Sequence, residues 1–129
     1  MLFRSIFKEK GEAYFRELES EVLKKMSFSE EAVILSTGGG VVLADRNIPL
    51  LKSCGKVVYL RTRPETVIER LKDDDSRPLL KTDNKEEKIR EILNKREEKY
   101  LAAADIILDT DDYNIIELAE KLFEMLNKQ

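Results

Sequence analysis

Three short apolar runs, separated by stretches of helical periodicity, limit most strictly what this chain can fold into. Each run is as short as a strand and is bordered by glycine or polar residues; the runs cover residues 32–35, 56–60 and 105–109. In the stretches around them, apolar residues recur every three or four positions. We therefore expect helices at residues 12–26, 45–52, 65–72, 85–103 and 113–126.

The alternation of strands and helices predicts an α/β fold with a mainly parallel sheet. Asp45 is the expected N-terminal cap of the second helix, and Pro64 suits the first turn of the third. Ligands of open parallel sheets bind beyond the carboxyl ends of the strands. Residues that directly follow the three runs are thus the first places to look for a site.

Composition argues against several classes of function. The 129 residues are the size of one domain. Their net charge of −3 is spread over interleaved acidic and basic residues, which is unlike a nucleic-acid-binding face. No apolar run approaches the ~20 residues that cross a membrane, and no export signal opens the chain. Cys54 is the single cysteine and no histidine could activate it, so we expect a cytoplasmic protein that binds a small molecule.

A glycine triplet follows the first apolar run. Ser36 and Thr37 lead directly into Gly38, Gly39 and Gly40. Glycines lack a Cβ, so the backbone here could approach a ligand closely. The alternative is a tight structural turn, which glycine clusters also mark.

Three arginines are candidates for binding an anion: Arg16, Arg77 and Arg96. A planar guanidinium binds a carboxylate or phosphate through two parallel hydrogen bonds, although a solvated surface charge is the alternative for each. Glu19, at the i+3 position from Arg16, could hold that arginine in orientation or form an ordinary helical ion pair.

Residues 73–78 concentrate like charges without apolar periodicity, which is typical of a loop. Arg77 lies in this loop and precedes the apolar residues 78–80, which could anchor a closing lid. The acidic clusters at residues 73–75 and 109–112 lack the spacing of a calcium loop. We interpret them as solvated loop charge and expect no metal ligands among them.

Several of these segments together, in this order and spacing, resemble shikimate kinases. They are Gly11-Glu12 with Phe15-Arg16, Ser36-Thr37-Gly38-Gly39-Gly40, Val57-Val58-Tyr59-Leu60, Arg77-Pro78-Leu79-Leu80, and Arg96 with Tyr100. The resemblance implies a transferase that moves the γ-phosphoryl group of ATP, with Mg²⁺, to the 3-hydroxyl of shikimate. Positioning and neutralisation of phosphate charge carry such a reaction.

The resemblance also implies roles for single residues. Arg16 and Arg96 would bind the shikimate carboxylate, with Glu19 supporting Arg16 from behind. The triplet would contact the ring hydroxyls, Gly39 most directly. Arg77 would act catalytically on the ATP phosphates from the lid, and Arg70 would stack near adenine.

The family begins with a strand, a phosphate-binding loop G-x-x-x-x-G-K-[ST] and a second strand that bears an aspartate near the reacting hydroxyl, and none of these has a match in this sequence. The resemblance therefore implies a three-layer parallel sheet of the P-loop kinase type that lacks its central first strand and its second strand. We expect one domain over residues 1–129, with a substrate-binding part at about 1–56 and a lid at about 73–84. We expect neither ATP nor Mg²⁺ to bind this chain tightly.

The gap in the expected sheet leaves three possibilities open: the flanking strands pair directly, another chain or a second copy supplies a strand, or the N-terminal part is produced separately. Three functions follow. The chain could be a shikimate kinase domain that is inactive without its phosphate loop. It could instead be a non-catalytic module that binds shikimate or a related carboxylate, or an interaction protein in which the arginines are incidental.

Overall fold

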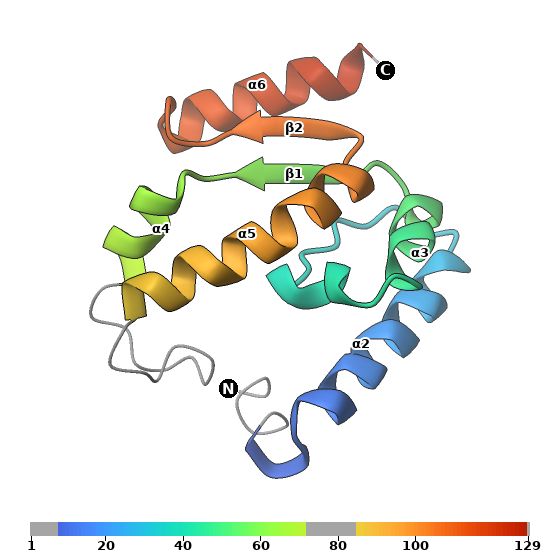
Figure 1. The fold of residues 1–129 in the computed structure, drawn as a ribbon. Coiled ribbons are helices and arrows are strands. Elements are labelled where there is room, and N and C mark those ends of the chain that lie inside the picture. Colours follow the sequence, from blue (N-terminus) through green and yellow to red (C-terminus); the bar gives the residue numbers. More distant parts are fainter. Residues whose placement is uncertain (1–7, 72–84, 129) are drawn as a thin grey trace. The chain divides into compact units, whose positions relative to one another are not determined.

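The computed structural model describes residues 8–71 and 85–128, and the chain divides into two compact units, Met1–Lys56 and Val57–Gln129. The predicted loop at 73–78 and the lid at 73–84, Arg77 included, lie outside the described residues. The boundary after Lys56 falls where we expected the substrate-binding part to end. The single domain over residues 1–129 stays a prediction. The elements, coloured along the chain in Figure 1, are α2 (Glu12–Ser27), η1 (Gly39–Leu43), α3 (Asn47–Cys54), β1 (Val58–Arg61), α4 (Pro64–Leu71), α5 (Lys85–Ala103), β2 (Ile106–Asp109) and α6 (Ile115–Asn127).

The first unit is built from α2, η1 and α3. The predicted helix at residues 12–26 is confirmed as α2. Its inward side packs against α3 and η1, and the buried apolar residues of this unit are Leu23, Val41, Val42 and Leu51. Each buried aliphatic side chain contributes about 1.5–3 kcal/mol to this small core.

The predicted strand at residues 32–35 is wrong. The segment has no regular secondary structure, and Val33 and Ile34 are 54% and 100% exposed. A strand exists only through hydrogen bonds to a neighbour, and no described segment pairs with this one. The segment is therefore apolar but exposed, whereas apolar runs of this kind are normally buried.

Asp45 does not cap α3 as predicted. The N-cap of this helix is Arg46, with helical backbone angles (φ −61°, ψ −22°) and no capping hydrogen bond from its side chain. The amide of Asn47 bonds to the carbonyl of Ala44, and that of Ile48 to Asp45. Since the chain is already turning at Ala44, Asp45 lies inside the turn and not at the extended position that a cap requires.

The second unit contains a parallel pair of strands, which confirms the runs at residues 56–60 and 105–109. The register aligns Val58 with Ile106 and Arg61 with Asp109, and Ile106 and Leu108 point into the core. Figure 1 shows the two strands pointing the same way, with α6 beside β2. Within the residues that the structure describes, the sheet has no third strand.

The helices of the second unit follow the sequence closely. α5 has the predicted bounds, and Ile89 and Ala103 are its buried residues. α4 begins at Pro64, as proline favours at a first helical position. α6 begins after Asn114, whose side chain accepts from the amide of Glu117 while Glu117 bonds back, a complete capping box. The predicted α/β class is thus confirmed, with an incomplete sheet.

Candidate functional site

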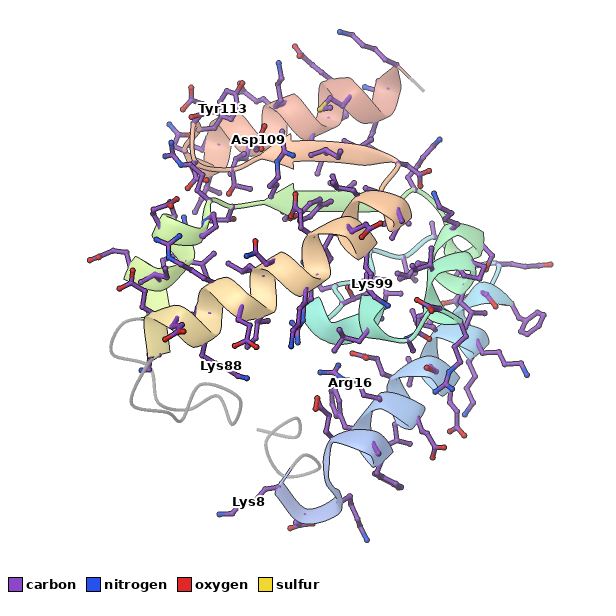
Figure 2. All side chains as sticks on the ribbon, in the orientation of Figure 1. Lys8, Arg16, Lys88, Lys99, Asp109 and Tyr113 are labelled. Atoms are coloured by element: carbon purple, nitrogen blue, oxygen red, sulfur yellow. The ribbon has the colours of Figure 1, made fainter. Side chains whose placement is uncertain are left out.

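Arg16 is held against the inner side of α2 by Glu19. Its Nη1 lies 3.0 Å from Glu19 Oε1, and the two side chains are only 17% and 13% exposed. Figure 2 labels Arg16 where its side chain leaves α2. The predicted i+3 contact is therefore present, and its burial distinguishes it from a solvated helical ion pair.

One donor of Arg16 has no acceptor. Among the described residues, Nε of Arg16 is the one buried side-chain nitrogen or oxygen without a hydrogen-bond partner. Leaving a buried donor unsatisfied costs about 1–3 kcal/mol, and such groups are rare in native proteins. Because Glu19 uses Nη1, the edge formed by Nε and Nη2 is the one that remains for an incoming anion.

The glycine triplet packs directly on this guanidinium. A Cβ added to Gly40 would lie 2.4 Å from Nη2 and 2.6 Å from Cζ and Nη1 of Arg16, whereas one on Gly38 would lie 3.6 Å from Glu19 Oε2. The described glycines with positive φ are Gly11 and Gly55, so the triplet is not a left-handed turn. Gly40 is needed for close approach, and Gly39 begins the short helix η1 beside it.

A buried polar network that the sequence analysis missed joins the same elements. Asn47 on α3 is 1% exposed; its Nδ2 donates to the Val41 carbonyl (2.8 Å) and its Oδ1 accepts from Ser20 (2.7 Å). Arg46 donates to the Ser20 hydroxyl from the other side (3.1 Å). One signal was available in the sequence: Ser20 is a polar residue on the inward stripe of α2, four positions after Arg16.

Arg96 lies in the second unit, half-buried on α5. No hydrogen bond or ion pair to Arg96 is present within residues 8–71 and 85–128. Its neighbour Glu97 accepts a 2.5 Å hydrogen bond from Tyr59 of β1, and the Tyr59 and Tyr100 rings are 5.0 Å apart. Burial, and then the hydrogen bond to Glu97, raise the pKa of Tyr59, so this phenol stays protonated and fastens α5 to the strand.

An open pocket of 770 Å³ lies beyond the carboxyl ends of β1 and β2. Arg70 contributes to it from the last turn of α4, and Thr62 and Thr110 follow the two strands directly and hydrogen-bond to each other at 2.8 Å. The other lining residues are Leu60, Tyr113, Asn114, Ile115, Ile116 and Leu118. The position agrees with where parallel sheets bind ligands, and the largely apolar lining suits a flat ring more than a phosphate.

The acidic residues after β2 engage neighbouring basic and backbone groups. Asp109 accepts two hydrogen bonds from Arg61, at 2.6 and 3.1 Å, and Arg61 lowers the pKa of its carboxyl. Asp111 accepts from the backbone amide of Arg63 at 2.7 Å. Within the part of the chain that the structure describes, no cluster of acidic, cysteine or histidine side chains could hold a metal ion.

The predicted site residues are therefore distributed over two units. Arg16, Glu19, Gly38 and Gly40 are brought together in the first, with Gly39 beside them. Arg70 and Arg96 belong to the second unit, Arg70 in the pocket and Arg96 on α5. In the described helices, none is long and apolar enough to span a membrane.

Comparisons with known proteins show the family. A family model described as shikimate kinase matches residues 1–127. The shikimate kinase of Moorella thermoacetica is 42% identical over 123 residues, which are 95% of this chain and 69% of that protein. That of Persephonella marina is 45% identical over 108 residues, covering 84% of this chain and 63% of that protein.

Solved structures show the same likeness. A shikimate kinase from Acinetobacter baumannii in complex with shikimate superposes with a TM-score of 0.87 at 35% identity, over 97% of this chain and 69% of that one. The shikimate kinase of Bacteroides thetaiotaomicron gives 0.78 at 32% identity, over 95% and 73%. The chain thus spans about seven tenths of the length of these relatives.

Proposed function

Because the chain belongs to the shikimate kinase family, we propose that it carries the shikimate-binding part of such an enzyme, with Arg16 as the main ligand of the substrate carboxylate. The observation that carries this proposal is the buried, unpartnered Nε of Arg16. Glu19 fixes the opposite corner of the guanidinium, so the edge that carries the unpaired donor is held in place before any ligand arrives. The relative from Acinetobacter baumannii is described with shikimate bound.

A carboxylate fits this edge better than other anions of similar size. Its two oxygens match the parallel N–H groups of one guanidinium edge, and such charge-assisted bonds are roughly twice as strong as neutral ones. Binding would also relieve the unsatisfied donor. The absence of a Cβ at Gly38 and Gly40 leaves backbone within reach of the ligand's ring hydroxyls, and Gly39 lies between them.

Arg96 is proposed as the second cation for the carboxylate. Its guanidinium has no partner in the described residues, and the helix turn that carries it is fastened to β1 through Glu97 and Tyr59. An arginine on a fixed helix loses little freedom when it binds.

For the nucleotide, we propose that Arg70 and the apolar pocket receive adenine and that Arg77, outside the described residues, acts on the phosphates. The largely apolar lining of the pocket supports this place for the base, but the sequence offers no G-x-x-x-x-G-K-[ST] loop to hold phosphates and Mg²⁺. We therefore assign no chemical step through ATP or Mg²⁺ to these residues. The isolated chain would bind Mg-ATP weakly and transfer phosphoryl groups negligibly.

A non-catalytic role, binding shikimate or a related carboxylate, is the second candidate. The same carboxylate site in Arg16, Gly39 and Arg96 would then serve binding alone. Phosphoryl transfer by the chain once a phosphate loop is supplied would distinguish the kinase domain from such a module.

The unpaired strand edges and the exposed segment at residues 33–35 support a further proposal, that copies of the chain associate by exchanging elements. Edge strands readily pair with other chains, and domain swapping is a common route to dimers. Sedimentation velocity over a hundredfold range of protein concentration tests it. We expect a dimer or larger species to grow with concentration, and a monomer at every concentration would contradict the proposal.

Arg16→Lys tests the carboxylate site directly. Lysine keeps the charge but loses the planar fork, so we expect shikimate to bind about tenfold more weakly. Arg63→Lys is the matched control. Its guanidinium is 66% exposed and pairs with Asp111, and both residues belong to the second unit, away from Arg16. Calorimetric titration of both variants measures the effect. Equal affinities for Arg16→Lys and the unmodified chain would remove Arg16 from the site.

A further inference from the structure

We infer that Asn47 and Ser20 are positioning residues for the carboxylate site, acting through Arg16 and the glycine triplet; this rests on the proposed function. Asn47 is the most completely buried large side chain in the described part of the molecule. Both ends of its amide are used, one toward α2 and one toward η1. A buried amide that is hydrogen-bonded at both its oxygen and its nitrogen is directional in a way that apolar packing is not.

The two contacts of Asn47 fall beside the site itself. Ser20 lies one helical turn after Arg16, and its hydroxyl is 3.2 Å from the Arg16 carbonyl oxygen. Val41, whose carbonyl accepts from Asn47, directly follows Gly40. The network therefore fixes α2 to η1 at the level where Gly40 covers the guanidinium.

Little space separates η1 from the Arg16 guanidinium at Gly40. Backbone at Gly40 approaches Arg16 so closely that no Cβ could be inserted between them. A slide of η1 along α2 would therefore press the Gly40 backbone against the guanidinium or draw it away. The apolar core of Leu23, Val42 and Leu51 holds the elements together but fixes no register, whereas the 2.7 and 2.8 Å hydrogen bonds of Asn47 do.

The distances also indicate which contact the hydroxyl hydrogen of Ser20 makes. Ser20 Oγ has one hydrogen, and the shorter contact, to Asn47 Oδ1, takes it. Arg46 Nε then donates to the oxygen of the same hydroxyl. The Ser20 hydroxyl thus accepts from Arg46 and donates to Asn47, and its removal would leave the buried Oδ1 of Asn47 without a donor.

The experiment compares Asn47→Ala and Ser20→Ala with Val42→Ala, which removes a buried apolar side chain from the same interface and leaves the network intact. Three quantities are measured on the full chain: urea unfolding, the shikimate dissociation constant, and the NMR signal of Arg16 Nε–H without ligand. For Asn47→Ala we expect shikimate binding weakened about tenfold relative to Val42→Ala, the value of one lost buried hydrogen bond. The Arg16 Nε–H signal should shift or broaden in both Asn47→Ala and Ser20→Ala. Ser20→Thr, which keeps the hydroxyl, should bind shikimate like the unmodified chain and show the same Nε–H signal.

Equal dissociation constants and an unchanged Nε–H signal in Asn47→Ala and Val42→Ala would overturn the inference and leave a purely structural role. If the unmodified chain fails to bind shikimate, the proposed function fails. The inference is then decided by the Arg16 Nε–H signal without ligand, compared between Asn47→Ala and Val42→Ala. If Asn47→Ala does not fold, Ser20→Ala carries the test, because the bond from Asn47 to Val41 survives in it.

Discussion

Supplying a phosphate-binding segment to this chain should raise phosphoryl transfer between ATP and shikimate by at least about 1,000-fold, since one phosphate-stabilising group is worth that much in such enzymes. The sequence contains no loop whose amides and lysine could hold the phosphates, so the isolated chain lacks most of the electrostatic stabilisation. The segment would come from the N-terminal part of a relative, such as the Moorella thermoacetica enzyme, fused ahead of Met1.

Release of ADP in a coupled assay measures this effect. The matched control is the same fusion with its loop lysine replaced by alanine, which supplies the strand but not the charge. We expect the control to fold like the fusion and to remain slow. Ordinary kinase rates from the unmodified chain, or from the lysine control, would contradict the account, because the phosphates would then be held by other residues.

Gly40→Ala should weaken shikimate binding about 100-fold, since two charge-assisted hydrogen bonds worth about 1.5–3 kcal/mol each depend on the place of one guanidinium. The new methyl group would occupy the position of Arg16 Nη2 and Cζ. The Arg16 side chain would have to move away from Glu19, and its Nε and Nη2 would no longer lie where we propose that the carboxylate binds.

Stability should change little in Gly40→Ala. Gly40 has no positive φ, and alanine reduces the freedom of the unfolded chain by about 0.4–1 kcal/mol. Gly38→Ala is the comparison, because its methyl group would make only an ordinary 3.6 Å contact with Glu19 and would leave Arg16 in place. Any loss of affinity in Gly38→Ala reports on contacts to the ring hydroxyls alone, and we expect it to be much smaller than the loss in Gly40→Ala. Urea unfolding and calorimetry on both variants separate folding from binding. Similar affinities for the two alanine variants would show that the close packing on Arg16 has no part in recognition.

Much of the local structure could be predicted from the sequence. Helical periodicity located α2 and gave α5 its bounds, because the residues that set these helices are their own neighbours in the chain. The β1 and β2 runs were recognised for the same reason. The segment at residues 33–35 was not, since its sequence fits a buried strand and only a partner in space decides whether it becomes one.

Some contacts of the site could be predicted from the sequence and others could not. The contact of Arg16 with Glu19 followed from helical spacing. The packing of Gly40 on Arg16 joins residues 24 positions apart, and no local pattern predicts it. Asn47 escaped notice because a single buried polar residue has no signature in sequence, and its importance arises from contacts to two other elements.

The most direct test of the account is calorimetric titration of the unmodified chain with shikimate and, separately, with Mg-ATP. We predict one shikimate bound per chain and no measurable heat of binding for Mg-ATP at the same concentrations. That result would mean that the carboxylate site forms without the phosphate loop. Failure to bind shikimate would contradict the central claim, and tight binding of Mg-ATP would show that other residues replace the missing loop.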